Sequence, residues 1–126
     1  MKVLLQGKIE GLVPSFRGTV NRNGVLSLQA DGDLALTVDT GFNGGIALPE
    51  KILEKMKVEL VDYGIFRLAT GKEVELPVFW GRVAMGKSQV ESWFIPGDSL
   101  IGMEFLSLAG PHLSFNFARR EVKLCK

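Results

Sequence analysis

The chain has 126 residues, of which 46% are hydrophobic, and it carries 15 basic against 14 acidic side chains. This length suits a single domain over residues 1–126 with one ordinary core, and the hydrophobic content argues against a disordered chain. The balanced charge, with no long run of one sign, gives no reason to expect nucleic acid or an anionic membrane as a partner.

The first third of the chain has strand-like composition. Its predicted strands, separated by Asn-Gly and Asp-Gly turn signals, cover residues 2–10, 25–30 and 33–39. Pro14 interrupts the pattern after the first of them, because proline cannot donate to a sheet ladder. These signals predict hairpins.

Two segments favour helix. In residues 48–60, Pro49 and Glu50 suit a first turn, and the apolar residues that follow fall on one side. The second segment starts after Gly102 and stops at the Gly-Pro pair 110–111. The other predicted strands cover residues 63–69, 73–80, 82–85, 89–95, 112–117 and 121–125. We therefore predict a mainly β fold, a closed barrel or sandwich with one or two short helices.

Metal chemistry and export are not expected. One cysteine, Cys125, and one histidine, His112, are too few soft ligands for a structural zinc site, and Cys125 cannot form an internal disulfide. The opening apolar run ends at Gln6, too early for the core of a signal peptide, and no stretch approaches the ~18 apolar residues of a membrane-spanning helix. We expect no cofactor, no membrane partner and a cytoplasmic location.

The most informative residues follow the strand-like run Leu-Ala-Leu-Thr-Val. Asp39 lies at the end of this run and is followed at once by Thr40 and Gly41. A carboxylate on a turn at the rim of an apolar core, held by a neighbouring hydroxyl, suits acid and base catalysis. Because Asp-Thr-Gly is also a common turn tripeptide, a plain turn is the alternative.

A second segment strengthens the catalytic interpretation. About sixty residues after Asp39, the apolar pair Leu100 and Ile101 is followed by Gly102 and the second predicted helix. The order and spacing of these two segments resemble the retropepsin-like aspartic proteases, over roughly residues 25–117. The run from Asp39 to Pro49 is similar to small prokaryotic and archaeal members of that clan, whereas viral members have Ala or Ser at the position of Phe42.

The resemblance implies a set of functional residues. Asp39 would be the catalytic acid and base, Thr40 and Gly41 would support the active-site loop, and Ile101 with Gly102 would cross beneath it in a ψ-shaped arrangement. The turn of the predicted hairpin over residues 63–80 falls where the family has its flap. The flap residues that would cover a bound peptide are Ala69, Thr70 and Gly71.

The implied mechanism also constrains assembly. Aspartic proteases use two carboxylates that share one proton, so one Asp cannot do both tasks. The sequence contains no second Asp-Thr-Gly or Asp-Ser-Gly. We therefore expect a homodimer in which Asp39 of each subunit meets the other on a twofold axis, acting as an endopeptidase on extended peptides or unfolded proteins.

Two other functions fit the same residues. A catalytically inactive dimeric β-domain of this fold would serve as a protein-binding or structural module, with its Asp-Thr-Gly loop kept for the scaffold. A small-ligand β-barrel would instead be a monomer with an interior cavity.

Overall fold

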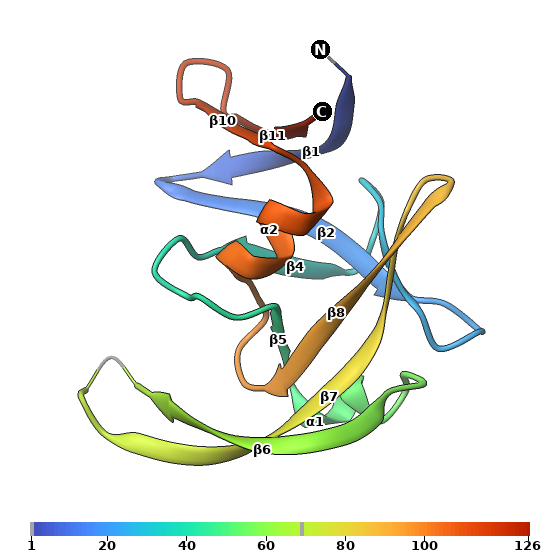
Figure 1. The fold of residues 1–126 in the computed structure, drawn as a ribbon. Coiled ribbons are helices and arrows are strands. Elements are labelled where there is room, and N and C mark those ends of the chain that lie inside the picture. The colour runs from blue at the N-terminus through green and yellow to red at the C-terminus, as the bar shows by residue number, and fades with distance from the viewer. Residues whose placement is uncertain (1, 69) are drawn as a thin grey trace.

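The computed structural model describes residues 2–68 and 70–126, and they form a mainly β fold with two short helices (Figure 1). The strands are β1 (Val3–Glu10), β2 (Val13–Val20), β3 (Leu26–Leu28), β4 (Leu34–Val38), β5 (Ile46–Leu48), β6 (Glu59–Arg67), β7 (Glu73–Met85), β8 (Ser88–Pro96), β9 (Leu100–Ile101), β10 (His112–Asn116) and β11 (Glu121–Cys125). The helices are α1 (Glu50–Leu53) and α2 (Met103–Ala109).

Seven of the strands close into a barrel. Pairing runs in the order β2-β3-β7-β8-β5-β9-β4, and β4 returns to β2, so the ring has no open edge. The prediction of a mainly β fold, a closed barrel or sandwich with one or two short helices, is thereby confirmed. Outside the ring, β6 pairs with β7, while β1, β11 and β10 extend in that order from β2 (Figure 1).

The core fills the barrel with the inward-facing residues of its strands. Strand β4 shows the alternation of inward and outward side chains, since Leu36 and Val38 are buried while Ala35 is exposed. The largest fully buried side chains are Phe16, Phe94, Phe105, Ile9, Leu26, Leu36, Ile46, Leu48, Ile101, Leu124, Val83 and Val122. They come from both ends of the chain, so the terminal strands β1 and β11 share the core with the barrel.

One crossing in the barrel positions the candidate site. The short strand β9 lies between β4 and β5, although β4 and β5 are consecutive in the chain. It runs parallel to β4, with Val38 opposite Ile101, and antiparallel to β5, with Ile46 opposite Ile101. The segment that joins β4 to β5, residues 39–45, is thus held against the end of β9 and the start of α2.

The N-terminal region differs from the sequence prediction. The expected interruption at Pro14 is wrong, because Pro14 lies within β2 and pairs with Ile9. It is the second residue of the strand, before pairing with β4 begins at Ser15, where a proline disturbs few ladder bonds. The first residues therefore add a hairpin to the sheet.

Two elements have other lengths than predicted. The helix predicted over residues 48–60 ends at Leu53, and the chain enters β6 at Glu59, where pairing with β7 outweighs helix propensity. The two strands predicted over 73–80 and 82–85 are one strand, β7, that continues through Gly81. Across residues 2–68 and 70–126, no helix has the length and apolar character needed to cross a membrane.

Candidate functional site

Asp39 lies where β4 leaves the barrel. Its side chain is half-buried, and its backbone N–H donates to the Ile101 carbonyl at 3.0 Å, which ties the end of β4 to β9. The Asp39 carboxylate accepts a hydrogen bond from the Gly41 N–H at 3.0 Å, and the Asp39 carbonyl accepts one from the Phe42 N–H at 3.1 Å. These bonds hold the carboxylate on a defined turn at the barrel rim.

The two residues after Asp39 face open space. Thr40 is exposed, and the described residues offer its hydroxyl no hydrogen-bond partner. Gly41 does not adopt a positive φ, and an added Cβ would meet only the Asp39 Oδ1, at an ordinary contact distance of 3.4 Å. The turn of this chain therefore does not itself require glycine at position 41.

Gly102 has the opposite environment. A Cβ at this position would lie 2.2 Å from the carbonyl oxygen of Gly44, and the Gly102 N–H donates to the Gly45 carbonyl at 2.7 Å. The next N–H, of Met103, donates to the Phe42 carbonyl at 2.8 Å. The start of α2 is thus bonded directly to the loop that follows Asp39, and only glycine fits at the contact.

The first prediction concerns this contact. Gly102→Ala should destabilise the fold by about 3 kcal/mol, because its methyl group collides with backbone rather than with a flexible side chain. Thermal unfolding should show a melting temperature lower by roughly 10 °C. Gly97→Ala is the control, since its Cβ would meet only the Ala47 side chain at 3.6 Å. Equal melting temperatures for the two variants would contradict the close approach.

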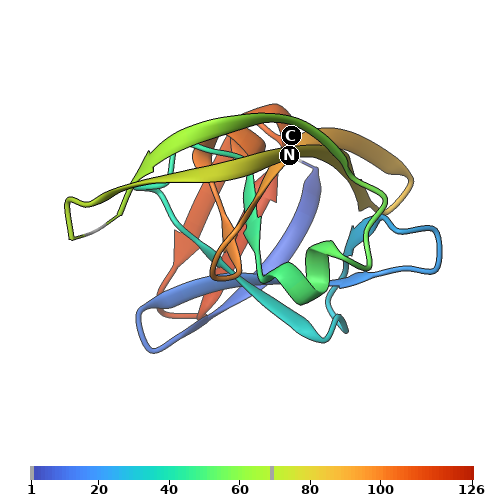
Figure 2. The ribbon, with the colours of Figure 1, turned by 90° about the horizontal axis from the view of Figure 1, so that it is seen from below.

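The hairpin of β6 and β7 reaches along the side of the molecule that carries the Asp39 loop. Its tip and residues 39–45 lie on the same side in both views (Figures 1 and 2). At the tip, Thr70 and Gly71 are exposed, and Gly71 adopts a φ of 85° that favours glycine. Ala69, the third predicted flap residue, lies outside the described residues.

An apolar cavity of about 180 Å³ lies between the Asp39 loop and this hairpin. Its volume is below the ~300–1,000 Å³ of sites for whole small molecules and suits one side chain. Its apolar lining residues come from the loop, β5, both hairpin strands and β8, and they are Phe42, Ile46, Phe66, Val78, Trp93 and Ile95. Glu104, in the first turn of α2, also lines it.

Sequence reasoning missed this cavity. Phe66 and Val78 lie in predicted strands, but the sequence pattern does not indicate which face of the sheet they occupy. Their positions follow from the β6–β7 register, in which Asp62 pairs with Val78. Trp93 is 38% exposed and packs edge-on against Trp80, with ring centroids 4.5 Å apart. No local pattern in the sequence marks this position, because the exposure of Trp93 becomes known only from the fold.

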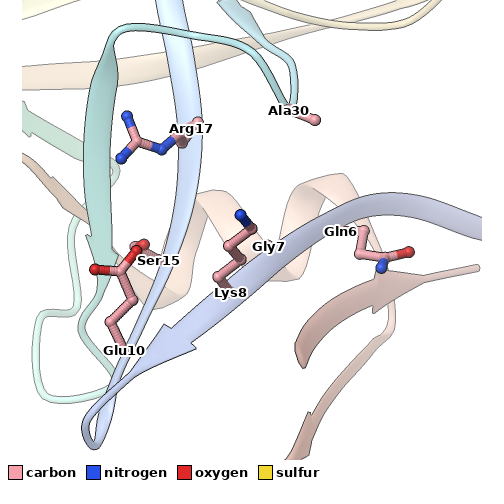
Figure 3. Close-up of a pocket in the computed structure, with 7 residues that line it drawn as sticks. All are labelled: Gln6, Gly7, Lys8, Glu10, Ser15, Arg17 and Ala30. Carbon is pink, nitrogen blue, oxygen red and sulfur yellow. The ribbon is translucent and has the colours of Figure 1, made fainter. Parts of the chain in front are cut away.

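A second hollow, of about 260 Å³, lies where β1 diverges from β2 (Figure 3). Its charged lining side chains, Lys8, Glu10 and Arg17, are all exposed, and Arg17 donates to the Gly32 carbonyl at 3.3 Å. Because these charges are of both signs and no aromatic side chain among the described residues lines the hollow, its lining does not favour one class of ligand. We assign no site there.

Neither metal ligands nor known proteins point to another site. Within residues 2–68 and 70–126, no three His, Cys, Asp or Glu side chains gather closely enough to hold a metal ion. Comparison of the chain with protein-family models, with curated proteins and with solved structures gave no match. The residues of the Asp39 region are therefore the candidate functional site.

Proposed function

We propose that the protein is an aspartic endopeptidase that works as a homodimer, with Asp39 of each subunit forming the catalytic pair. The observation that carries this proposal is the insertion of β9 between β4 and β5, which holds the half-buried Asp39 at the barrel rim. This arrangement supports the proposal, because the resemblance to retropepsin-like proteases implies that these two segments cross beneath the active site. The adjacent hairpin and cavity supply a cover and a place for a substrate side chain.

The proposed chemistry needs both carboxylates. One Asp39 carboxylate takes a proton from a water molecule as the water oxygen attacks the scissile carbonyl carbon, and the other carboxyl group donates its proton to the carbonyl oxygen. The tetrahedral intermediate then collapses with proton transfer to the amide nitrogen, which breaks the C–N bond. The two side chains return to sharing one proton.

An extended peptide is the substrate that the surroundings favour. At the exposed hairpin tip the Gly71 N–H already donates to the Leu68 carbonyl at 2.9 Å, so the tip would meet a strand-like ligand through the carbonyls of Thr70 and Gly71. Gly41 leaves open space beside the carboxylate for the substrate backbone. Thr40, exposed next to it, is free to donate its hydroxyl to the loop of the second subunit.

Two turns of the sheet contain strongly exposed apolar side chains. The β1–β2 turn and the β10–β11 turn lie on the same side of the molecule as the Asp39 loop in both views (Figures 1 and 2). Leu12, in the first turn, is 84% exposed, and Phe117, in the second, is 61% exposed and stacks on Phe115. Exposed apolar side chains favour contact with another chain, and we assign these two turns to the dimer interface.

The second prediction tests the assignment of these turns to the dimer interface. Leu12→Asp should weaken dimerisation at least tenfold, because burying the new carboxylate opposite its own symmetry mate is costly. Analytical ultracentrifugation should show monomers, and peptide cleavage should fall in parallel. Val3→Asp is the matched control, at the far end of β1 and 43% exposed. A fully dimeric Leu12→Asp variant would place the interface elsewhere.

Inhibitor stoichiometry tests the proposal as a whole. A statine-type peptide carries a hydroxyl that resembles the tetrahedral intermediate and should bind between the two Asp39 carboxylates. Isothermal titration calorimetry between pH ~4 and 7 should therefore give one inhibitor for every two chains. One inhibitor per chain, or no binding to a protein that is dimeric, would reject the shared site.

One observation favours the competing function, an inactive dimeric binding module. The Asp39 carboxylate already has a structural role in the single chain, as acceptor for the Gly41 N–H. A scaffold role of this kind would be served equally by Asn, which keeps the accepting oxygen. Cleavage by the unsubstituted protein that is lost in the Asp39→Asn variant therefore favours the protease, and a dimer that is inert in both forms favours the binding module.

A further inference from the structure

The cavity beside the Asp39 loop carries a charge pattern that an apolar pocket does not need. Three of its lining residues are aromatic, namely Phe42, Phe66 and Trp93. Glu104 is the one charged residue among the described residues that line it. The pocket therefore combines aromatic rings with one carboxylate and has no basic lining residue of its own.

Glu104 is held at the edge of this cavity by the backbone. Its N–H donates to the Gly44 carbonyl at 3.2 Å, which fixes the first turn of α2 against the loop that contains Phe42. The side chain is exposed, and it takes part in none of the ion pairs found in the described part of the chain. Its negative charge is thus available to a group that enters the cavity.

We infer that this cavity receives a lysine or arginine side chain of the substrate polypeptide. The aliphatic stem of such a side chain packs against apolar walls while its charged end stays near water. Aromatic rings attract a cation over their faces, and an adjacent carboxylate pairs with it. A purely apolar side chain fills the same volume but leaves Glu104 unused, so charge complementarity selects the basic one.

Symmetry makes this inference more specific, and here it rests on the proposed function. A twofold dimer contains the cavity twice, once on each side of the paired Asp39 carboxylates. A bound peptide should therefore show a preference for Lys or Arg at two positions, one before and one after the scissile bond, at equal distances from it. A preference on one side alone contradicts this arrangement.

Cleavage of a positional peptide library tests the preference. Each position near the scissile bond is varied among Lys, Arg, Gln, Glu and norleucine, which matches the lysine stem without its charge. We expect kcat/KM to be about fivefold higher for Lys than for norleucine at the two positions, with Glu least favoured. Glu104→Gln should abolish this ratio, while Glu54→Gln, in the exposed turn after α1, should preserve it. A norleucine preference in the unsubstituted protein would overturn the inference.

A binding measurement separates this inference from the proposed protease activity. The full-length Asp39→Asn protein is titrated with fluorescent lysine and norleucine peptides at ~50 and ~500 mM salt, and the lysine advantage should shrink at high salt. Cleavage without a lysine preference would reject the pocket and keep the protease. Glu104-dependent lysine binding without any cleavage by the unsubstituted protein would keep the lysine pocket and reject the protease. Equal binding of the lysine and norleucine peptides would reject the pocket.

Discussion

Asp39→Asn should lower kcat/KM for peptide cleavage by at least ~10³-fold while leaving the fold intact. Asparagine keeps the oxygen that accepts from the Gly41 N–H, so the turn after β4 is retained. It cannot take a proton from water or hold one for the carbonyl oxygen. Because the proposed dimer would pair position 39 with itself, one substitution would remove both catalytic groups. Cleavage kinetics and a melting temperature changed by about 2 °C or less would together show this.

The control is Asp62→Asn. Asp62 is exposed, and its carboxylate, like that of Asp39, accepts a hydrogen bond from a backbone N–H, here that of Tyr63 at 2.8 Å. Removing its charge repeats the chemical change away from the Asp39 loop and should leave kcat/KM within twofold. Mixing experiments add a second criterion, since a dimer in which one subunit carries Asp39→Asn lacks half of the catalytic pair. Cleavage should then fall more steeply than the fraction of unsubstituted chains. Full activity of the variant would exclude Asp39 as the catalytic group, whereas a dimer that is inert with and without the substitution would establish the binding module.

The sequence predicted those parts of the fold that local pattern controls. The alternation of Leu34, Leu36 and Val38 identified β4, and the Gly102 and Gly110 boundaries identified α2. Predictions from local pattern were wrong where pairing with a distant strand determines the structure. The helical pattern after Pro49 continues beyond Leu53, yet from Glu59 onward the chain forms a strand that pairs with β7.

The candidate site divides in the same way. Asp39 and the segment at Ile101 could be identified from sequence, because each is a short contiguous motif. The cavity could not be identified from sequence, because its walls come from five separate segments. Which side chains of these segments point into the cavity depends on the strand register and on where α2 begins. The role of Gly41 was also beyond local reasoning, since its backbone conformation does not explain the glycine.

Gly41→Ala should separate function from folding more sharply than any other substitution in the loop. In the single chain the new methyl group meets only the Asp39 Oδ1 at 3.4 Å, and the backbone needs no left-handed conformation. Alanine also restricts the unfolded chain, so stability should stay constant or rise by up to about 1 kcal/mol. Differential scanning calorimetry checks this part of the prediction.

Activity should nevertheless fall by at least ~100-fold, because two methyl groups, one from each subunit, would enter the space beside the paired carboxylates where the substrate backbone must lie. The statine-type inhibitor should lose affinity to a similar degree, since it occupies the same space. Gly102→Ala provides the contrast, because its methyl group collides with the Gly44 carbonyl inside the protomer and should lower stability. If Gly41→Ala remained fully active, the open space beside Asp39 would have no substrate or second subunit in it, and the dimeric active site would be excluded.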